Sequence, residues 1–114
     1  MADDVIYVNT EDGLKRLMNN TKVYIKVLGK FKDDDSFKIF ETAMAEGDME
    51  KAKVAVHTLK GLAANLSLTE LAKQALELEL QMKGGYVDLN QATTVKNVYY
   101  QTLIEAEKVI AQYA

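Results

Sequence analysis

The sequence predicts an all-α protein that folds as an antiparallel up-and-down four-helix bundle with one or two short additional N-terminal helices. The chain has no proline and only six glycines among its 114 residues, so residues that break helices are rare. Alanine, leucine, lysine, glutamate and methionine, which favour helices, are abundant, and no segment alternates as a strand would. Because the chain contains no linker, repeat or low-complexity stretch, residues 1–114 are expected to form a single domain.

Three helices are predicted in the first half of the chain. The first starts at an N-cap, Thr10, and ends at the Asn19-Asn20 pair, and the second begins after Thr21. The third follows the acidic break at residues 33–35 and stops near Gly47. The two N-terminal helices are expected to lie against the bundle or to cover one end of it. The apolar residues at helical spacing in these three segments are Leu14, Leu17, Tyr24, Leu28, Phe31, Phe37, Phe40 and Met44.

The second half of the chain contains three longer predicted helices. Asp48 is the expected N-cap of the fourth helix, which runs to the residue before Ser67. Ser67 opens a capping-box pattern, with a carboxylate three residues later, so it is the expected N-cap of the fifth helix. Gly84-Gly85 ends that helix, and Asp88 or Asn90 opens the last one. Turns this short make consecutive helices antiparallel neighbours.

His57, the only histidine in the chain, is the first candidate functional residue. It lies about 100° around the fourth helix from Val56, and so off the buried stripe of that helix. This stripe consists of Val56, Leu59, Ala63 and Leu66. Lys53 and Lys60, one turn before and after His57, place positive charge on both sides of the imidazole, where it would stabilise a phosphoryl group. A solvated helix face has the same composition, so this pattern alone leaves both interpretations open.

Gly61 is unusual because it lies inside a helix and on the same face as His57. A glycine there costs roughly 1 kcal/mol of helix stability relative to alanine. Clearance for an approaching partner explains it, and Ala64, one turn further, keeps the same face low. A metal site is a poor alternative, because the chain has no cysteine and no second histidine. A serine hydrolase is also disfavoured, since no motif supplies a nucleophile and an oxyanion hole.

Glu79 is a carboxylate at the border of the predicted apolar stripe of the fifth helix. That stripe consists of Leu68, Leu71, Ala72, Ala75, Leu76 and Met82. His57 precedes Ser67 by ten residues and Glu79 follows it by twelve, so antiparallel helices place the two at nearly the same level. We expect Glu79 to accept a hydrogen bond from the imidazole, which would fix the tautomer and orient the ring. The alternative is a rim carboxylate that reaches water.

Residues 55–66, Ala-Val-His-Thr-Leu-Lys-Gly-Leu-Ala-Ala-Asn-Leu, resemble the motif of histidine-containing phosphotransfer (HPt) domains. Residues 13–31, the turn at residues 46–48 and the Leu76-Glu77 pair also resemble their counterparts in that family. The similarity therefore covers most of the chain. The family commonly has glycine ten residues after the histidine, where this chain has Ser67. Because serine caps helices well, this exchange is expected to be tolerated.

The resemblance implies a histidine phosphotransfer protein that relays a phosphoryl group between receiver-domain aspartates of two-component signalling proteins. By match, His57 is the phosphoacceptor, Lys60 steadies the phosphate and Gly61 gives clearance. Many members place a glutamine or glutamate against the histidine, and Glu79 falls at that position. The resemblance implies a phosphocarrier without kinase or ATPase activity of its own. Its expected partners are response-regulator receiver domains and a sensor histidine kinase. No cofactor is expected, and Mg²⁺ is expected only on the partner receiver.

Two other functions remain open at this point. One is the phosphoacceptor domain of a chemotaxis-type histidine kinase, in which an ATP-binding domain elsewhere would supply the phosphoryl group. The other is a non-catalytic helical interaction module, although the intact His-x-x-Lys-Gly pattern argues against it.

Composition limits the partners and the location. The net charge is −3 and no basic stripe is present, which argues against nucleic-acid binding. No apolar run reaches the ~20 residues that span a bilayer, so no direct membrane contact is expected. Residues 1–4 are polar and acidic, unlike a signal peptide, and the absence of cysteine fits a reducing compartment. We therefore expect a cytoplasmic protein, or a cytoplasmic domain of a membrane-bound hybrid kinase.

Overall fold

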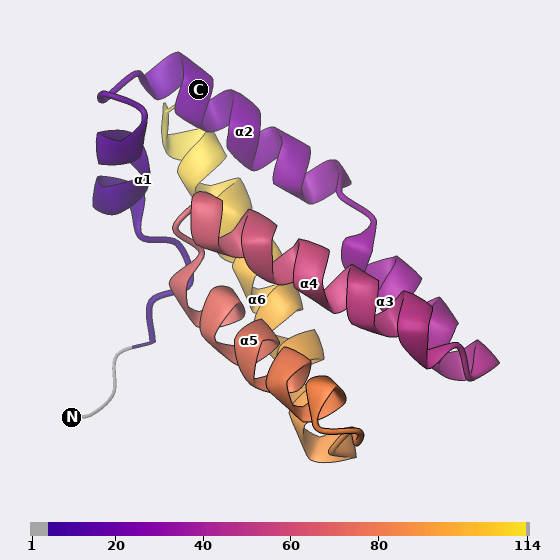
Figure 1. The fold of residues 1–114 in the computed structure, drawn as a ribbon. Helices are drawn as coiled ribbons and strands as arrows, with labels where there is room; N and C mark the ends of the chain where they lie inside the picture. The colour runs from indigo at the N-terminus through magenta and orange to yellow at the C-terminus, as the bar shows by residue number, and fades with distance from the viewer. Residues whose placement is uncertain (1–4, 114) are drawn as a thin grey trace.

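The computed structural model describes residues 5–113, and within this range the chain forms helices and no strand (Figure 1). The helices are α1 (Thr10–Arg16), α2 (Thr21–Asp33), α3 (Ser36–Glu46), α4 (Met49–Asn65), α5 (Thr69–Lys83) and α6 (Leu89–Tyr113). This confirms the predicted all-α helical bundle. Residues 1–4, whose composition is unlike that of a signal peptide, lie outside the described residues.

The last four helices form the bundle that carries the candidate site. α3 packs on α4, α4 on α5 and α5 on α6, and each runs antiparallel to the one before it (Figure 1). α2 lies against α6, and α1 packs on α2. α2 therefore extends the bundle along α6, α1 lies near the turn between α4 and α5, and α4 and α5 lie side by side (Figure 1).

An aromatic cluster joins α2, α3 and α6. The rings of Phe37 and Tyr99 stack with their centroids 4.6 Å apart, and Phe31 meets Tyr99 edge to face at 5.9 Å. Tyr24, Leu28 and Phe31 of α2 are completely buried, as their spacing predicts. Stacked and edge-to-face pairs stabilise a core beyond the area that they bury, so this cluster fixes α2 to the bundle.

The N-cap of α4 is the predicted residue, Asp48, whereas α1 and α2 begin one residue earlier than predicted, at Thr10 and Thr21. The Asp48 side chain accepts a hydrogen bond from the Lys51 amide at 3.1 Å and caps α4 as expected. The caps of α1 and α2 are instead the preceding asparagines, Asn9 and Asn20, whose side chains accept from amides three residues on. Asparagine is a stronger N-cap than threonine, so each threonine becomes the first helical residue.

The predicted N-cap role of Ser67 is wrong. Leu68 occupies the cap position of α5, and no side chain caps this helix. Ser67 has a φ of +59°, in the left-handed region, and its hydroxyl donates to Asp12 Oδ2 at 2.5 Å. Left-handed backbone favours glycine, which is the residue that the family resemblance implies at this position. Serine is held there by α1, which lies next to the α4–α5 turn.

The buried face of α5 is shifted from the predicted stripe. Leu76 was expected in the core but is 43% exposed, and Leu78 and Gln81 are buried instead. α5 packs against both α4 and α6, so its buried face is wider than a single stripe. Gln81 is satisfied there, because its Oε1 accepts from the amide of Asp88 at 3.0 Å.

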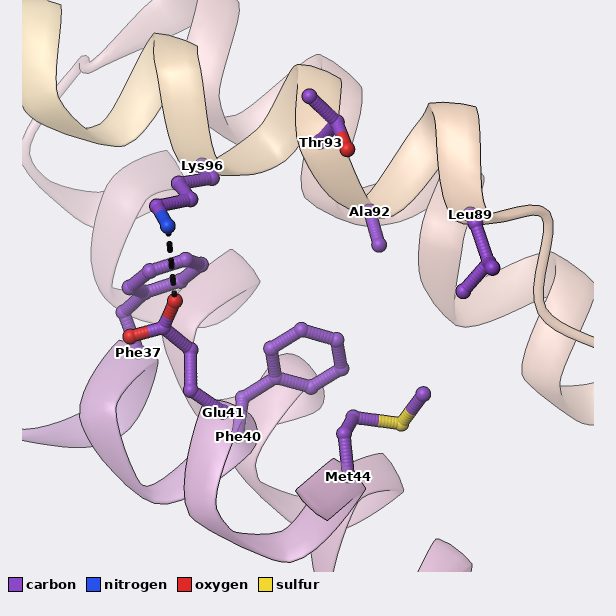
Figure 2. A pocket seen from close by; sticks show the side chains of 8 residues that line it. All are labelled: Phe37, Phe40, Glu41, Met44, Leu89, Ala92, Thr93 and Lys96. Carbon is purple, nitrogen blue, oxygen red and sulfur yellow. Dashed lines mark ion pairs between the residues drawn. The ribbon is translucent and has the colours of Figure 1, made fainter.

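A hollow of about 380 Å³ lies along the seam between α3 and the first turns of α6 (Figure 2). Phe37, Phe40 and Met44 line it from α3, and Leu89 and Ala92 line it from α6. The ion pair between Glu41 and Lys96, at 3.6 Å, crosses its edge. None of its lining residues comes from α4 or α5, so it is separate from the surface around His57.

Within residues 5–113, no helix is long and apolar enough to cross a membrane.

Candidate functional site

His57 lies on the outer face of α4, with its side chain 65% exposed. Val56 and Leu59 of the same helix are buried in the core, as the predicted stripe requires. The helix geometry therefore presents the imidazole to solvent.

Glu79 of α5 is brought against His57 and is only 2% exposed. Its Oε2 lies 2.5 Å from His57 Nδ1. Because an ionised carboxylate only accepts hydrogen bonds, Nδ1 must carry the hydrogen that it donates. In the neutral ring this assignment leaves Nε2 with a free lone pair. The contact thus selects one tautomer and fixes the orientation of an otherwise exposed ring.

Lys60 lies on the other oxygen of the same carboxylate. Its Nζ is 3.0 Å from Glu79 Oε1, and its side chain is only 27% exposed. Oε1 has no well-aligned hydrogen-bond donor among the described residues, so the ammonium group compensates for its burial. In this structure Lys60 is therefore the close counter-ion of Glu79.

The environment of Glu79 keeps it ionised. Burial raises the pKa of this carboxyl, but the ammonium group of Lys60 and the hydrogen bond from His57 outweigh burial, so the pKa lies below its usual value. A carboxylate in this state is a permanent acceptor for the Nδ1 hydrogen. The tautomer of His57 is thus fixed by a group whose own charge is stabilised by Lys60.

Lys83 is a member of the site that the sequence did not indicate as a candidate. It follows Glu79 by one turn of α5, and its Nζ lies 4.0 Å from Glu79 Oε2. The spacing of four residues between an acid and a base was a usable signal. α5 carries two lysines, Lys73 and Lys83, and only the geometry shows that Lys83 is the one near the histidine.

Lys53 does not contact Glu79 and pairs instead with Glu50 of its own helix, at 3.5 Å. Lys53 and Lys83 line one hollow of about 320 Å³ together with Met49, Glu50, Met82 and Gly85. This hollow adjoins the His57 face toward the N-terminal end of α4. Lys53 is therefore near the site, with its charge partly neutralised by a neighbour.

Gly61 and Ala64 leave the surface beside His57 open. Apart from its chain neighbours and the adjacent backbone of α4, a Cβ atom at Gly61 would meet no atom within 4 Å. Packing inside this domain therefore does not require glycine at this position. Ala64 is exposed on the same face. The small residues at these two positions leave this side of the imidazole uncovered.

Comparison with known proteins identifies the family. The family model described as the Hpt domain matches residues 33–107, which is about two thirds of the chain and includes every candidate residue above. No curated protein and no solved structure matches the chain. Hpt domains act in phosphotransfer within two-component phosphorelays and interact with response-regulator receiver domains. The chain, with its helical bundle and its single exposed histidine, belongs to the Hpt domain family.

Proposed function

We propose that this protein is a phosphocarrier that relays a phosphoryl group between receiver aspartates through a phosphohistidine at His57. The single observation that carries this proposal is the contact of His57 Nδ1 with the buried carboxylate of Glu79, at 2.5 Å. It leaves Nε2 as the nitrogen with a lone pair on an exposed ring. Nε2 is accordingly the proposed phosphoacceptor atom.

The proposed reaction is an in-line displacement at phosphorus. The Nε2 lone pair forms the N–P bond while the P–O bond to the receiver's aspartate breaks, and the aspartate carboxylate leaves with the bonding electrons. The hydrogen stays on Nδ1, and the positive charge that develops on the ring is stabilised by Glu79. Return of the phosphoryl group to a second receiver is the same step in reverse.

The neighbours of His57 take distinct roles in this proposal. Lys60 stabilises the phosphoryl group from a position next to Glu79, and Lys53 adds positive charge from the preceding turn. Gly61 and Ala64 supply steric clearance for the receiver. Support for this division comes from the open space around Gly61 and from the ion pair of Lys60, at 3.0 Å, within one turn of His57.

The receiver is proposed to supply the rest of the chemistry. Its acidic pocket and Mg²⁺ would neutralise charge on the transferred group, so this chain needs no cofactor and has no kinase or ATPase activity of its own. Docking is expected to be transient, because a carrier must release each partner. We also propose a cytoplasmic location, where receivers and kinases act.

The decisive experiment is transfer from a phosphorylated receiver. The wild-type protein should acquire a phosphate that is labile in acid and stable in alkali, and His57→Gln should acquire none. His57 is mostly exposed, so this variant should fold, which circular dichroism would verify. An equal label on His57→Gln would disprove the proposal. If label arrives only from ATP and an isolated kinase domain, the chemotaxis-type phosphoacceptor replaces the relay carrier.

A further inference from the structure

We propose that Lys83 is the mobile cation that binds the phosphoryl group of phosphorylated His57. This inference rests on the function proposed above and extends it to a residue of α5. Lys83 Nζ lies 4.0 Å from Glu79 Oε2, the oxygen that also accepts the hydrogen of His57 Nδ1. An ammonium group therefore lies next to the histidine before any phosphoryl group arrives.

Lys60 and Lys83 differ in how tightly the carboxylate holds them. Lys60 lies at 3.0 Å and is 27% exposed, whereas Lys83 lies at 4.0 Å and is 61% exposed. Glu79 is almost fully buried, so it must keep a close cation, and Lys60 is that cation. A long, solvated ion pair such as that of Lys83 costs little to break. Lys83 is therefore the lysine that can leave Glu79 for a stronger anion.

The two lysines reach the histidine from opposite ends. Lys60 follows His57 along α4 and Lys83 follows Glu79 along α5, and these helices run antiparallel. A dianionic phosphoryl group on Nε2 would lie between them. Lys83 also lines the hollow of about 320 Å³ beside the site, which gives its side chain room to turn toward the phosphoryl group.

Lys53 lines the same hollow but is a weaker candidate for this role. Its ammonium group pairs with Glu50 at 3.5 Å, and that carboxylate would oppose a nearby phosphoryl group. The charged groups that face the hollow are thus two lysines and one glutamate. Lys83 is the cation among them whose partner, Glu79, already has Lys60 as a closer counter-ion.

The test is the lifetime of the phosphohistidine in the absence of receiver. Wild type, Lys83→Ala, Lys83→Arg and Lys73→Ala would be phosphorylated, freed of receiver and followed by loss of label. Lys73→Ala is the matched control, because it removes the same charge from the same helix at a position six residues before Glu79. Loss of an exposed cation predicts a lifetime roughly two- to fivefold shorter in Lys83→Ala. Lys83→Arg should preserve the lifetime and Lys73→Ala should not change it.

A second readout separates phosphate binding from a structural role. A nearby ammonium group favours the dianionic phosphoryl group, so Lys83→Ala should raise its pKa in a ³¹P NMR titration. An unchanged lifetime and titration in labelled Lys83→Ala would overturn the role of Lys83 and leave the proposed function intact. An equal effect of Lys73→Ala would also overturn it. Absence of label on wild type would instead overturn the proposed function, and the role of Lys83 with it.

Discussion

His57 Nδ1 and Glu79 Oε2 lie 2.5 Å apart and join an exposed ring on α4 to a carboxylate buried on α5. The contact makes the surface position of His57 compatible with a fixed ring orientation. An unsupported histidine at this position would rotate and exchange tautomers in water. Here Nε2 remains accessible because Nδ1 is held from the protein side.

Replacing Glu79 should separate orientation from charge. Glu79→Gln keeps an acceptor for the Nδ1 hydrogen, whereas Glu79→Ala removes it. A hydrogen bond to a charged group contributes about 1.5–3 kcal/mol, which corresponds to roughly 10- to 100-fold in rate for Glu79→Ala. Glu79→Gln should lose less. Rapid-quench measurement of transfer from a phosphorylated receiver would check this order, and equal rates in the two variants would refute an orienting role.

Lys60→Ala should lower the free energy of unfolding as well as the rate of phosphoryl transfer. Its removal leaves Glu79 Oε1 buried without its close cation, which costs about 1–3 kcal/mol. Lys96→Ala is the matched control, because its pair with Glu41 is exposed and is expected to contribute about 0–1 kcal/mol. Urea unfolding gives both values. Adding Glu79→Gln to Lys60→Ala should recover most of the loss, and no recovery would show that the cost arises elsewhere.

The depressed pKa of Glu79 predicts acid sensitivity. The unfolded chain binds this proton near the ordinary pKa of 4.5, and the folded protein binds it only at lower pH. Stability from this group is therefore complete above pH 4.5 and is lost as pH falls through the folded-state pKa. Urea unfolding from neutral to acid pH should show a smaller decline for Glu79→Gln than for wild type. Parallel pH profiles would contradict the assignment.

Gly61 should be dispensable for folding but not for transfer. Alanine fits at Gly61 without a contact inside 4 Å, so Gly61→Ala should stabilise the domain by about 0.5–1 kcal/mol. Gly29 of α2 is an equally open helical glycine, and Gly29→Ala should give the same gain. Only the change at Gly61 should slow transfer, since α2 lies away from His57. Thermal unfolding together with a transfer assay checks both effects, and an unaffected rate in Gly61→Ala would remove the clearance role.

The sequence predicts that Glu79 lies at the same height as His57 along the paired helices. It does not predict which lysine pairs with which carboxylate. Counting residues on either side of Ser67 places His57 and Glu79 opposite each other, because antiparallel helices rise equally per residue. Lysine side chains are long and flexible, so residue spacing does not determine that Lys60 binds Oε1 or that Lys53 turns to Glu50. The error at Leu76 has another cause. Helix periodicity indicates one buried face, and the position of α6 relative to α5 is a tertiary feature.

At Ser67 the local sequence pattern and the tertiary structure favour different roles. The capping-box pattern favours Ser67 as a cap, but the turn places it at φ +59°, and its hydroxyl bonds Asp12 of α1. Left-handed backbone costs about 1–2 kcal/mol in a residue with a side chain, and the hydrogen bond offsets about 1 kcal/mol of this. Ser67→Ala loses the bond and keeps the strain, so it should be destabilised by about 1 kcal/mol. Ser67→Gly loses both and should be close to wild type in urea unfolding. A glycine variant as unstable as the alanine variant would show that the hydroxyl, and not the backbone, determines the stability of this turn.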